Sequence, residues 1–235
     1  EARRAVIAPR LTRLVRVPDL ASFRRVLVER AVSGTLAHIL HRAIIVPSHA
    51  AAEQLRRTLE DARLAAAPAA LALPSILTRG DWRAALHDAL AGAAPAVDAF
   101  EREVLLQAAC RSAAAAGQPP PFTIRPGLVT EMLAFYDGVR RHGRTVADFE
   151  RVATTALERD VDTDRGAIRM PDHTRSLAAA FRRYEALLAG RGLVDEHGLT
   201  AAVLAAPSSP FSHVIVAVSD RAGEPGGLWP SDFDL

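Results

Sequence analysis

The chain has no lysine, so all 29 of its lysine-plus-arginine residues are arginines. It has one cysteine, Cys110, which excludes an internal disulfide and a zinc cluster built from cysteines. Cys110 lies in a helical pattern of apolar residues, which favours a small core residue over a nucleophile. The formal net charge is only +2, which gives little general attraction to polyanions. Any contact with nucleic acid must therefore come from local placement of groups.

Long apolar runs are also missing. The longest stretches, such as 64–73, are rich in alanine and broken by proline, well short of the roughly 20 residues of a membrane-spanning helix. The first residues carry too brief an apolar core for a secretory signal. We therefore predict no transmembrane helix, no membrane partner, and a cytoplasmic protein whose ends were cut. With 235 residues and 49% hydrophobic residues, the chain can bury a core in one domain or two small ones.

Strand patterns and helical patterns alternate in the first part of the chain. The strands are predicted at 11–17, 42–46 and 73–78, and the helices at 22–32, 49–64 and 80–90. The second strand is dense in β-branched residues and ends at Pro47 and Ser48. Strands that alternate with helices predict a parallel sheet with helices on its faces.

From residue 99 to about 204 no strand pattern is convincing, and amphipathic helices follow one another. They are predicted at 100–115, 126–142, 146–159 and 174–191. The continuous apolar run at 213–218 then predicts a strand that is buried on both faces. The sequence thus divides into a sheet part at 1–98, a helical insertion at 99–204, and a return to the sheet at 205–235.

This order of parts resembles the first RecA-like lobe of superfamily 1 helicases of the UvrD/RecB type. Residues 44–55 are similar to motif Ia of that family, where a strand ends in a small hydroxyl residue before an Ala-Ala helix start. Residues 73–78 resemble the next strand, and 184–199 resemble the helix and turn by which the insertion returns to the sheet. The run 213–220 then takes the Walker B place. The nearest resemblance is to the N-terminal region of AddB/RecC-like proteins of the PD-(D/E)XK nuclease family.

The resemblance implies a RecA-like, P-loop-type parallel sheet whose nucleotide site is degenerate. A working site needs a glycine-rich loop, a lysine that reaches the phosphates and a hydroxyl on Mg²⁺. The corresponding loop contains Pro18, Asp19 and Ser22, with no glycine and no lysine. The Walker B strand ends in Ser219 and Asp220, where one acid of the expected pair is missing. We therefore predict no hydrolysis, no catalytic residue and no cofactor.

Predicted contacts with DNA cluster where strands end. Ser48, with the N–H groups of Ala50 and Ala51 behind it, is suited to hold one phosphate of single-stranded DNA, and His49 is predicted to contact DNA beside it. The alternative is that Ser48 serves only as a helix cap. Thr78 could offer a hydroxyl and Trp82 a stacking surface for a base, although packing within the lobe is the alternative for Trp82.

Other charged groups have structural interpretations beside the functional ones. Arg140 and Arg141 end a predicted helix, where they either touch phosphate or stabilise the helix C-terminus. Asp195 is predicted to cap the helix that follows it rather than to act in chemistry. The histidines His38 and His41 lack a carboxylate at ligand spacing, so no metal site is predicted.

The resulting hypothesis is a non-catalytic module of a bacterial enzyme for repair and recombination at double-strand breaks. It would bind single-stranded DNA or duplex ends and scaffold a helicase-nuclease partner of the AddA/RecB type, and the full-length protein would be a nuclease. Two alternatives stay open. One is an ATP-driven helicase or nuclease subunit with an atypical nucleotide site, and the other is a helical protein-interaction module.

Overall fold

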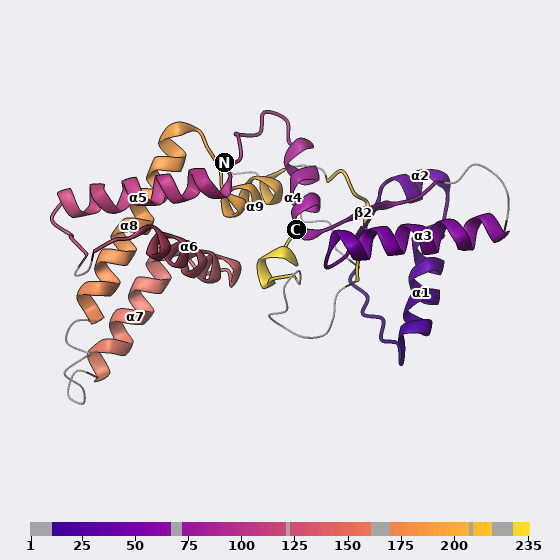
Figure 1. Ribbon diagram of the computed structural model, residues 1–235, viewed down its shortest axis with the longest axis horizontal. Helices are drawn as coiled ribbons and strands as arrows, with labels where there is room; N and C mark the ends of the chain where they lie inside the picture. Colours follow the sequence, from indigo (N-terminus) through magenta and orange to yellow (C-terminus); the bar gives the residue numbers. More distant parts are fainter. Residues whose placement is uncertain (1–10, 67–71, 121–122, 161–169, 207–208, 218–227) are drawn as a thin grey trace, which may run out of the picture. The chain divides into compact units, whose positions relative to one another are not determined.

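A computed structural model describes residues 11–66, 72–120, 123–160, 170–206, 209–217 and 228–235, with side chains undescribed at 158–160. The chain divides into two compact units (Figure 1). The first, here called the sheet unit, comprises residues 1–91 and 205–228. The second, the helical unit, comprises residues 92–204 and 229–235. None of the described helices is both long and apolar enough to cross a membrane.

The sheet unit is built on three short parallel strands in the order β2-β1-β3. They are β1 (Arg42–Ile45), β2 (Ser75–Leu77) and β3 (His213–Val216). Ile44 of β1 pairs with Ile76 on one side and with Ile215 on the other. Every residue of β1 is buried, because β1 lies in the middle of the sheet. The predicted parallel sheet with helices around it is thus confirmed in this mixed α/β chain.

Three of the helices in the sheet unit form where the sequence predicts them, with small differences at their ends, and the short helix at 36–40 was not predicted. They are α1 (Leu20–Val32), α2 (Leu36–Leu40), α3 (His49–Ala66) and α4 (Arg79–Asp88). One apolar core joins Leu27 of α1 and Leu59 of α3 to Ile44 of β1. Helices α1 and α3 therefore cover the same face of the sheet. The Arg42 guanidinium is buried beneath α1 and donates to the carbonyls of Arg30 and Ala31, both at 2.7 Å.

Two strand predictions need correction. Residues 11–17 form no strand here, and Leu11 and Leu14 are 98% and 73% exposed, because no neighbouring strand pairs with this segment. The strand near 213 forms, but His213, Val214 and Val216 are exposed rather than buried on both faces. The physical reason is position, since β3 lies at an edge of the sheet and not in its middle.

The helical unit packs its helices around one large apolar core. Its elements are α5 (Ala99–Ala115), α6 (Pro126–Arg141), α7 (Val146–Asp160), α8 (Met170–Arg191), α9 (Glu196–Ala205) and the short 3-10 helix η2 (Pro230–Asp232). Helix α8 lies against both α5 and α7 (Figure 1). Leu106, Tyr136, Phe181 and Tyr184 are almost fully buried at the centre. The predicted core role of Cys110 is confirmed, since it is buried and 2% exposed there.

The segment before α5 is joined to the segment between α8 and α9. Ala96 and Val194 form an isolated parallel bridge. The N–H of Val97 donates to the carbonyl of Val194 at 2.9 Å, and the N–H of Val194 donates to the carbonyl of Pro95 at 3.0 Å. Residues 95–97, where the chain enters this unit, are therefore held beside Val194, which lies between α8 and α9.

Candidate functional site

The carboxyl edge of the sheet brings Ser48 and Thr78 to neighbouring positions. Ser48 follows β1 and Thr78 follows β2, and the two strands are adjacent and parallel. The N–H of Val46 donates to the carbonyl of Leu77 at 2.9 Å, which continues the pairing up to this edge. Because the carboxyl ends of parallel strands share one edge, both residues lie where open α/β sheets bind ligands.

Ser48 begins helix α3. Its Oγ accepts a hydrogen bond from the N–H of Ala51 at 3.2 Å, and its carbonyl accepts from the N–H of Ala52 at 3.0 Å. The N–H groups of His49 and Ala50 belong to the first turn, where no carbonyl of the helix can reach them. Both residues are exposed. The start of α3 thus offers outward-facing donors at the positive end of a helix dipole.

Thr78 begins helix α4 in a capping box with Asp81. The N–H of Thr78 donates to Asp81 Oδ2 at 3.1 Å, and Thr78 Oγ1 accepts from the N–H of Asp81 at 3.3 Å. His49 Nδ1 lies 3.5 Å from the same Asp81 oxygen, so the starts of α3 and α4 meet. The hydrogen bonds from Thr78, with a smaller contribution from His49, lower the pKa of Asp81. The edge therefore combines two helix N-termini with one ionised carboxylate.

Trp82 lies in α4 but is not open to a ligand. Its side chain is buried and only 3% exposed, and its indole Nε1 has no hydrogen-bond partner among the described residues. A ring this deeply buried offers no face on which a base could stack. The predicted stacking role of Trp82 is therefore wrong. The ring packs inside the sheet unit, as the other interpretation of the sequence had it.

Arg140 and Arg141 lie in the helical unit and are engaged with carboxylates. Arg141 Nε donates to Glu196 Oε1 at 2.6 Å, and the guanidinium of Arg141 lies 5.3 Å from the centre of the Trp229 ring. Arg140 Nη1 lies 3.8 Å from Glu185 Oε1. These contacts favour the structural interpretation of both arginines, while contact with DNA phosphate stays a prediction.

The loop predicted as a degenerate nucleotide site forms a helix cap. Asp19 Oδ1 accepts from the N–H of Ser22 at 2.7 Å, at the start of α1 and next to Pro18. That hydrogen bond lowers the pKa of Asp19, so its carboxylate is charged. A phosphate bound here would need the same N–H groups and would be repelled by that charge. The other predicted residues of this site, Ser219 and Asp220, lie outside the described residues.

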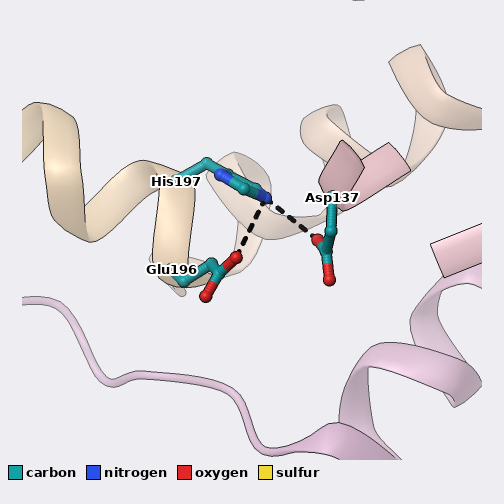
Figure 2. A group of neighbouring side chains, drawn as sticks. All are labelled: Asp137, Glu196 and His197. Carbon is teal, nitrogen blue, oxygen red and sulfur yellow. Dashed lines mark hydrogen bonds and ion pairs between the residues drawn. The ribbon is translucent and has the colours of Figure 1, made fainter. Parts of the chain in front are cut away.

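A second group of functional side chains is buried in the helical unit, around Asp137 of α6. Arg102 of α5 grips this carboxylate with two hydrogen bonds, from Nη1 to Oδ2 at 3.1 Å and from Nη2 to Oδ1 at 2.5 Å. His197 Nε2 lies 2.9 Å from Asp137 Oδ1 and 3.7 Å from Glu196 Oε1, as the dashed lines of Figure 2 show. Because an ionised carboxylate can only accept, His197 Nε2 carries the proton between them.

The surrounding polar groups complete this network. Arg102 Nε donates to the hydroxyl of Tyr184 at 3.1 Å, and Tyr184 in turn lies 3.4 Å from Asp195 Oδ2. Asp195 Oδ1 accepts from the N–H groups of His197 and Gly198 at 3.0 and 2.9 Å, so the predicted capping role of Asp195 is confirmed. Burial by itself would raise the pKa of Asp137, but hydrogen bonds from His197 and Arg102 outweigh it and lower that pKa to about 2.

Asp137, Glu196 and His197 have the composition of a metal site, and their ligand atoms lie within 4.8 Å of one another. Their partners do not suit a cation. Both oxygens of Asp137 accept hydrogen bonds from Arg102, and a second guanidinium, that of Arg141, lies 3.7 Å from Asp137 Oδ2. Two fixed positive charges beside the site repel a metal ion and already neutralise its carboxylates. The trio is therefore part of an ion-pair network that joins α5, α6 and α9.

Arg102 and Asp137 were not predicted from the sequence. A signal existed, because both are charged residues at positions where the helical pattern places the apolar face; Asp137 directly follows Tyr136 and lies one turn after Leu133. A charge on such a face requires a buried partner. The partner itself could not be read from local spacing, since it lies on another helix.

Comparisons with protein-family models, with curated proteins and with solved structures found no match to this chain.

Proposed function

We propose that this chain is a non-catalytic, helicase-like module of a bacterial machine for repair and recombination of DNA. Its sheet unit, a RecA-like lobe, binds single-stranded DNA through a phosphate at the start of α3. Its helical unit serves as the scaffold for a helicase-nuclease partner of the AddA/RecB type. The observation that carries the proposal is the exposed first turn of α3, behind Ser48, at the carboxyl edge of a parallel sheet.

The cap of helix α1, where a nucleotide would be expected to bind, favours binding without catalysis. The carboxylate of Asp19 takes the N–H of Ser22, the type of group that a bound nucleotide phosphate would need. The chain has no lysine to reach a phosphate in its place. The start of α3 differs, because its own cap, Ser48, is neutral and accepts from Ala51 rather than from His49 or Ala50. The nearby carboxylate of Asp81 is held by Thr78 and lies beside His49.

The test compares two variants of the same helix. Ala50→Glu places a negative charge in the first turn of α3, where it suits the helix dipole but repels phosphate. Ala62→Glu makes the same change of charge at an exposed position three turns later, about 18 Å away. Fluorescence anisotropy with a labelled single-stranded oligonucleotide should show binding weakened about tenfold or more by Ala50→Glu. Binding by Ala62→Glu should stay within a few-fold of the unmodified chain.

Ser48→Ala is a second, less selective variant. It removes the hydroxyl at the site but also the N-cap of α3, whose loss costs about 1 kcal/mol of stability. Its effect on DNA binding should therefore be read beside a thermal melt. Equal weakening by Ala50→Glu and Ala62→Glu would contradict the placement of the phosphate, and binding of ATP in a calorimeter would contradict the non-catalytic role.

A helical interaction module is the second candidate function. The observation in its favour is the buried network of Arg102, Asp137 and His197, which fixes α5, α6 and α9 to one another. A rigid helical surface of this kind suits a protein partner that needs no reorganisation on binding. Tight binding of a partner protein, together with no measurable binding of the oligonucleotide, would favour this candidate over the first.

A further inference from the structure

The amino edge of the sheet gathers positive charge beneath the end of helix α1. Arg42 and His213 are the first residues of β1 and β3, and they are register partners in the parallel pair. Register partners place their side chains on the same face of a sheet, and every second residue returns to that face. The next such pair, Ile44 and Ile215, belongs to the core that α1 covers. Arg42 and His213 therefore also face α1.

Arg42 is a buried cation that no described carboxylate compensates. Its side chain is 4% exposed, and its guanidinium donates to the carbonyls of Arg30 and Ala31 at the end of α1. Its Nε is buried and has no hydrogen-bond partner among the described residues. Buried charges are normally paired with opposite ones. The C-terminus of a helix carries only about half of a negative charge, so α1 offsets part of the charge of Arg42 and leaves the rest.

Two further basic groups lie beside this buried guanidinium. Arg30 is half-buried in the last turn of α1, and the ring of His213 is exposed. Desolvation lowers the pKa of His213, and the charges of Arg42 and Arg30 lower it further, because they repel a third cation. Among the described residues, no carboxylate pairs with any of the three. The amino edge thus presents concentrated positive charge next to an accessible imidazole.

We propose that His213, Arg42 and Arg30 form a binding site for a tetrahedral oxyanion of the phosphate class. Arg30 and the protonated ring of His213 donate to the anion from the surface, and Arg42 attracts it from beneath. Charge-assisted hydrogen bonds of this kind are the usual contacts of phosphate oxygens in proteins. The site lies at the edge of the sheet opposite Ser48, which follows the carboxyl end of β1, so it does not rest on the proposed function.

Binding at this site should strengthen as the pH falls. The anion supplies the negative charge that favours the protonated ring of His213, and by reciprocity protonation favours the anion. We expect affinity about tenfold higher for the protonated ring, because each pKa unit of coupling is a factor of ten. Other titratable groups near this edge are Glu29, His38 and His41, and all three are exposed. None of them is among the charges that act on His213.

The ring signals of the whole chain in NMR test this site while sulfate is added at constant ionic strength. Sulfate is the probe because its charge is the same at pH 5.5 and at pH 8. The spectrum of His213→Gln identifies the signal of His213 among the eight histidines. Sulfate should shift this signal, raise the pKa of His213, and bind about tenfold more tightly at pH 5.5 than at pH 8. In His213→Gln, the amide signal of Arg42 should report weaker binding with little dependence on pH.

Two arginine variants of α1 separate a formed site from general attraction. Arg30→Gln removes a donor and should weaken sulfate binding about fivefold or more. Arg24→Gln removes the same charge from an exposed position about 9 Å earlier along the helix, and should change binding less than about twofold. Neither substitution alters the backbone carbonyls that Arg42 binds, so the end of α1 stays anchored in both.

The proposal is overturned if sulfate leaves the His213 signal unchanged, if affinity is the same at both pH values, or if Arg30→Gln and Arg24→Gln weaken binding equally. A single-stranded oligonucleotide then distinguishes the source of the anion. Tighter binding than sulfate at equal phosphate concentration assigns the site to a polynucleotide, and equal or weaker binding assigns it to a free oxyanion. Both results support the site. Ala50→Glu should leave the response to sulfate unchanged, so failure at α3 and failure at this edge are distinguishable.

Discussion

The two units of this chain use their charged side chains in different ways. In the sheet unit, Asp19, Thr78 and Arg42 bind backbone groups at the ends of helices. The helical unit has helix caps as well, but it also has a buried ion pair, Arg102 with Asp137, that joins two helices. A cap stabilises one helix, whereas a buried ion pair makes several helices depend on each other. We therefore expect different substitutions to destabilise the two units.

The chain provides a reporter for each unit. Its two tryptophans are Trp82, in α4 of the sheet unit, and Trp229, which packs against Arg141 in the helical unit. Replacing either tryptophan by phenylalanine leaves the fluorescence of the other unit alone. Unfolding in urea can then be followed for each unit separately.

The largest expected effect comes from Asp137→Ala. Removal of this carboxylate leaves the buried charge of Arg102 and the N–H of His197 without their acceptor. Loss of one partner of a buried ion pair costs about 3–5 kcal/mol. The midpoint of urea unfolding reported by Trp229 should fall accordingly, and the midpoint reported by Trp82 should stay unchanged.

A matched control for that variant is Asp172→Ala. Asp172 pairs with Arg175 at 2.7 Å, but its side chain is 72% exposed. Removal of a surface pair of this kind costs about 0–1 kcal/mol. Equal destabilisation by the two aspartate variants would show that burial does not set the cost of losing a carboxylate in this unit.

The second-largest expected effect is a loss of stability of the helical unit at low pH. The pKa of Asp137 is about 2 in the folded chain, below its ordinary value of 3.8. A lowered pKa adds stability above the ordinary value, and this stability is lost as the pH falls from about 4 through 2. The shift corresponds to about 2 kcal/mol for the helical unit. Urea midpoints from Trp229 at pH 6 and at pH 2.5 should show this loss.

Asp137→Asn identifies the source of that acid sensitivity. Asp148, at the start of α7, also has its pKa lowered to about 2 by hydrogen bonds with Thr145, but it lies at the surface, with 34% of its side chain exposed. Because solvent screens Asp148, most of the dependence on pH should disappear with Asp137→Asn. An unchanged dependence in that variant would assign the effect to exposed carboxylates.

The smallest effects compare one capping box in each unit. Thr78 pairs with Asp81 at the start of α4, and Asp98 pairs with Glu101 at the start of α5. Thr78→Ala and Asp98→Ala should each cost about 1 kcal/mol. Thr78→Ala should move only the Trp82 signal and Asp98→Ala only the Trp229 signal. A cap variant that shifts both signals would show that the units unfold together.

Local patterns in the sequence were sufficient for most helices and for the central strand. The β-branched run at 42–46 predicted β1, and the residues before the helices predicted the caps at Ser48 and Asp195. The run at 213–218 was equally apolar, yet β3 is an exposed edge strand. Hydrophobicity measures how much a strand can bury, and the order of strands decides how much it does bury.

The polar network was beyond local reasoning. Arg141 was interpreted as a helix end or a DNA contact, and its acceptor proved to be Glu196, far along the chain on another helix. Asp137 likewise meets His197 only because α6 and α9 pack together. Ion pairs between residues far apart in the sequence leave no periodic pattern. A charge on the apolar face of a helix indicates only that a buried partner is needed.

The bridge between Ala96 and Val194 bears on the order in which the chain folds. Strand β3 pairs with β1 although residues 92–204 of the helical unit lie between β2 and β3 in the sequence. Once the bridge has formed, the free connection between those strands is roughly threefold shorter, which lowers its loop-closure entropy cost by about 1 kcal/mol. The folded insertion therefore favours pairing of β3 with β1, because it brings the two ends of the long connection together.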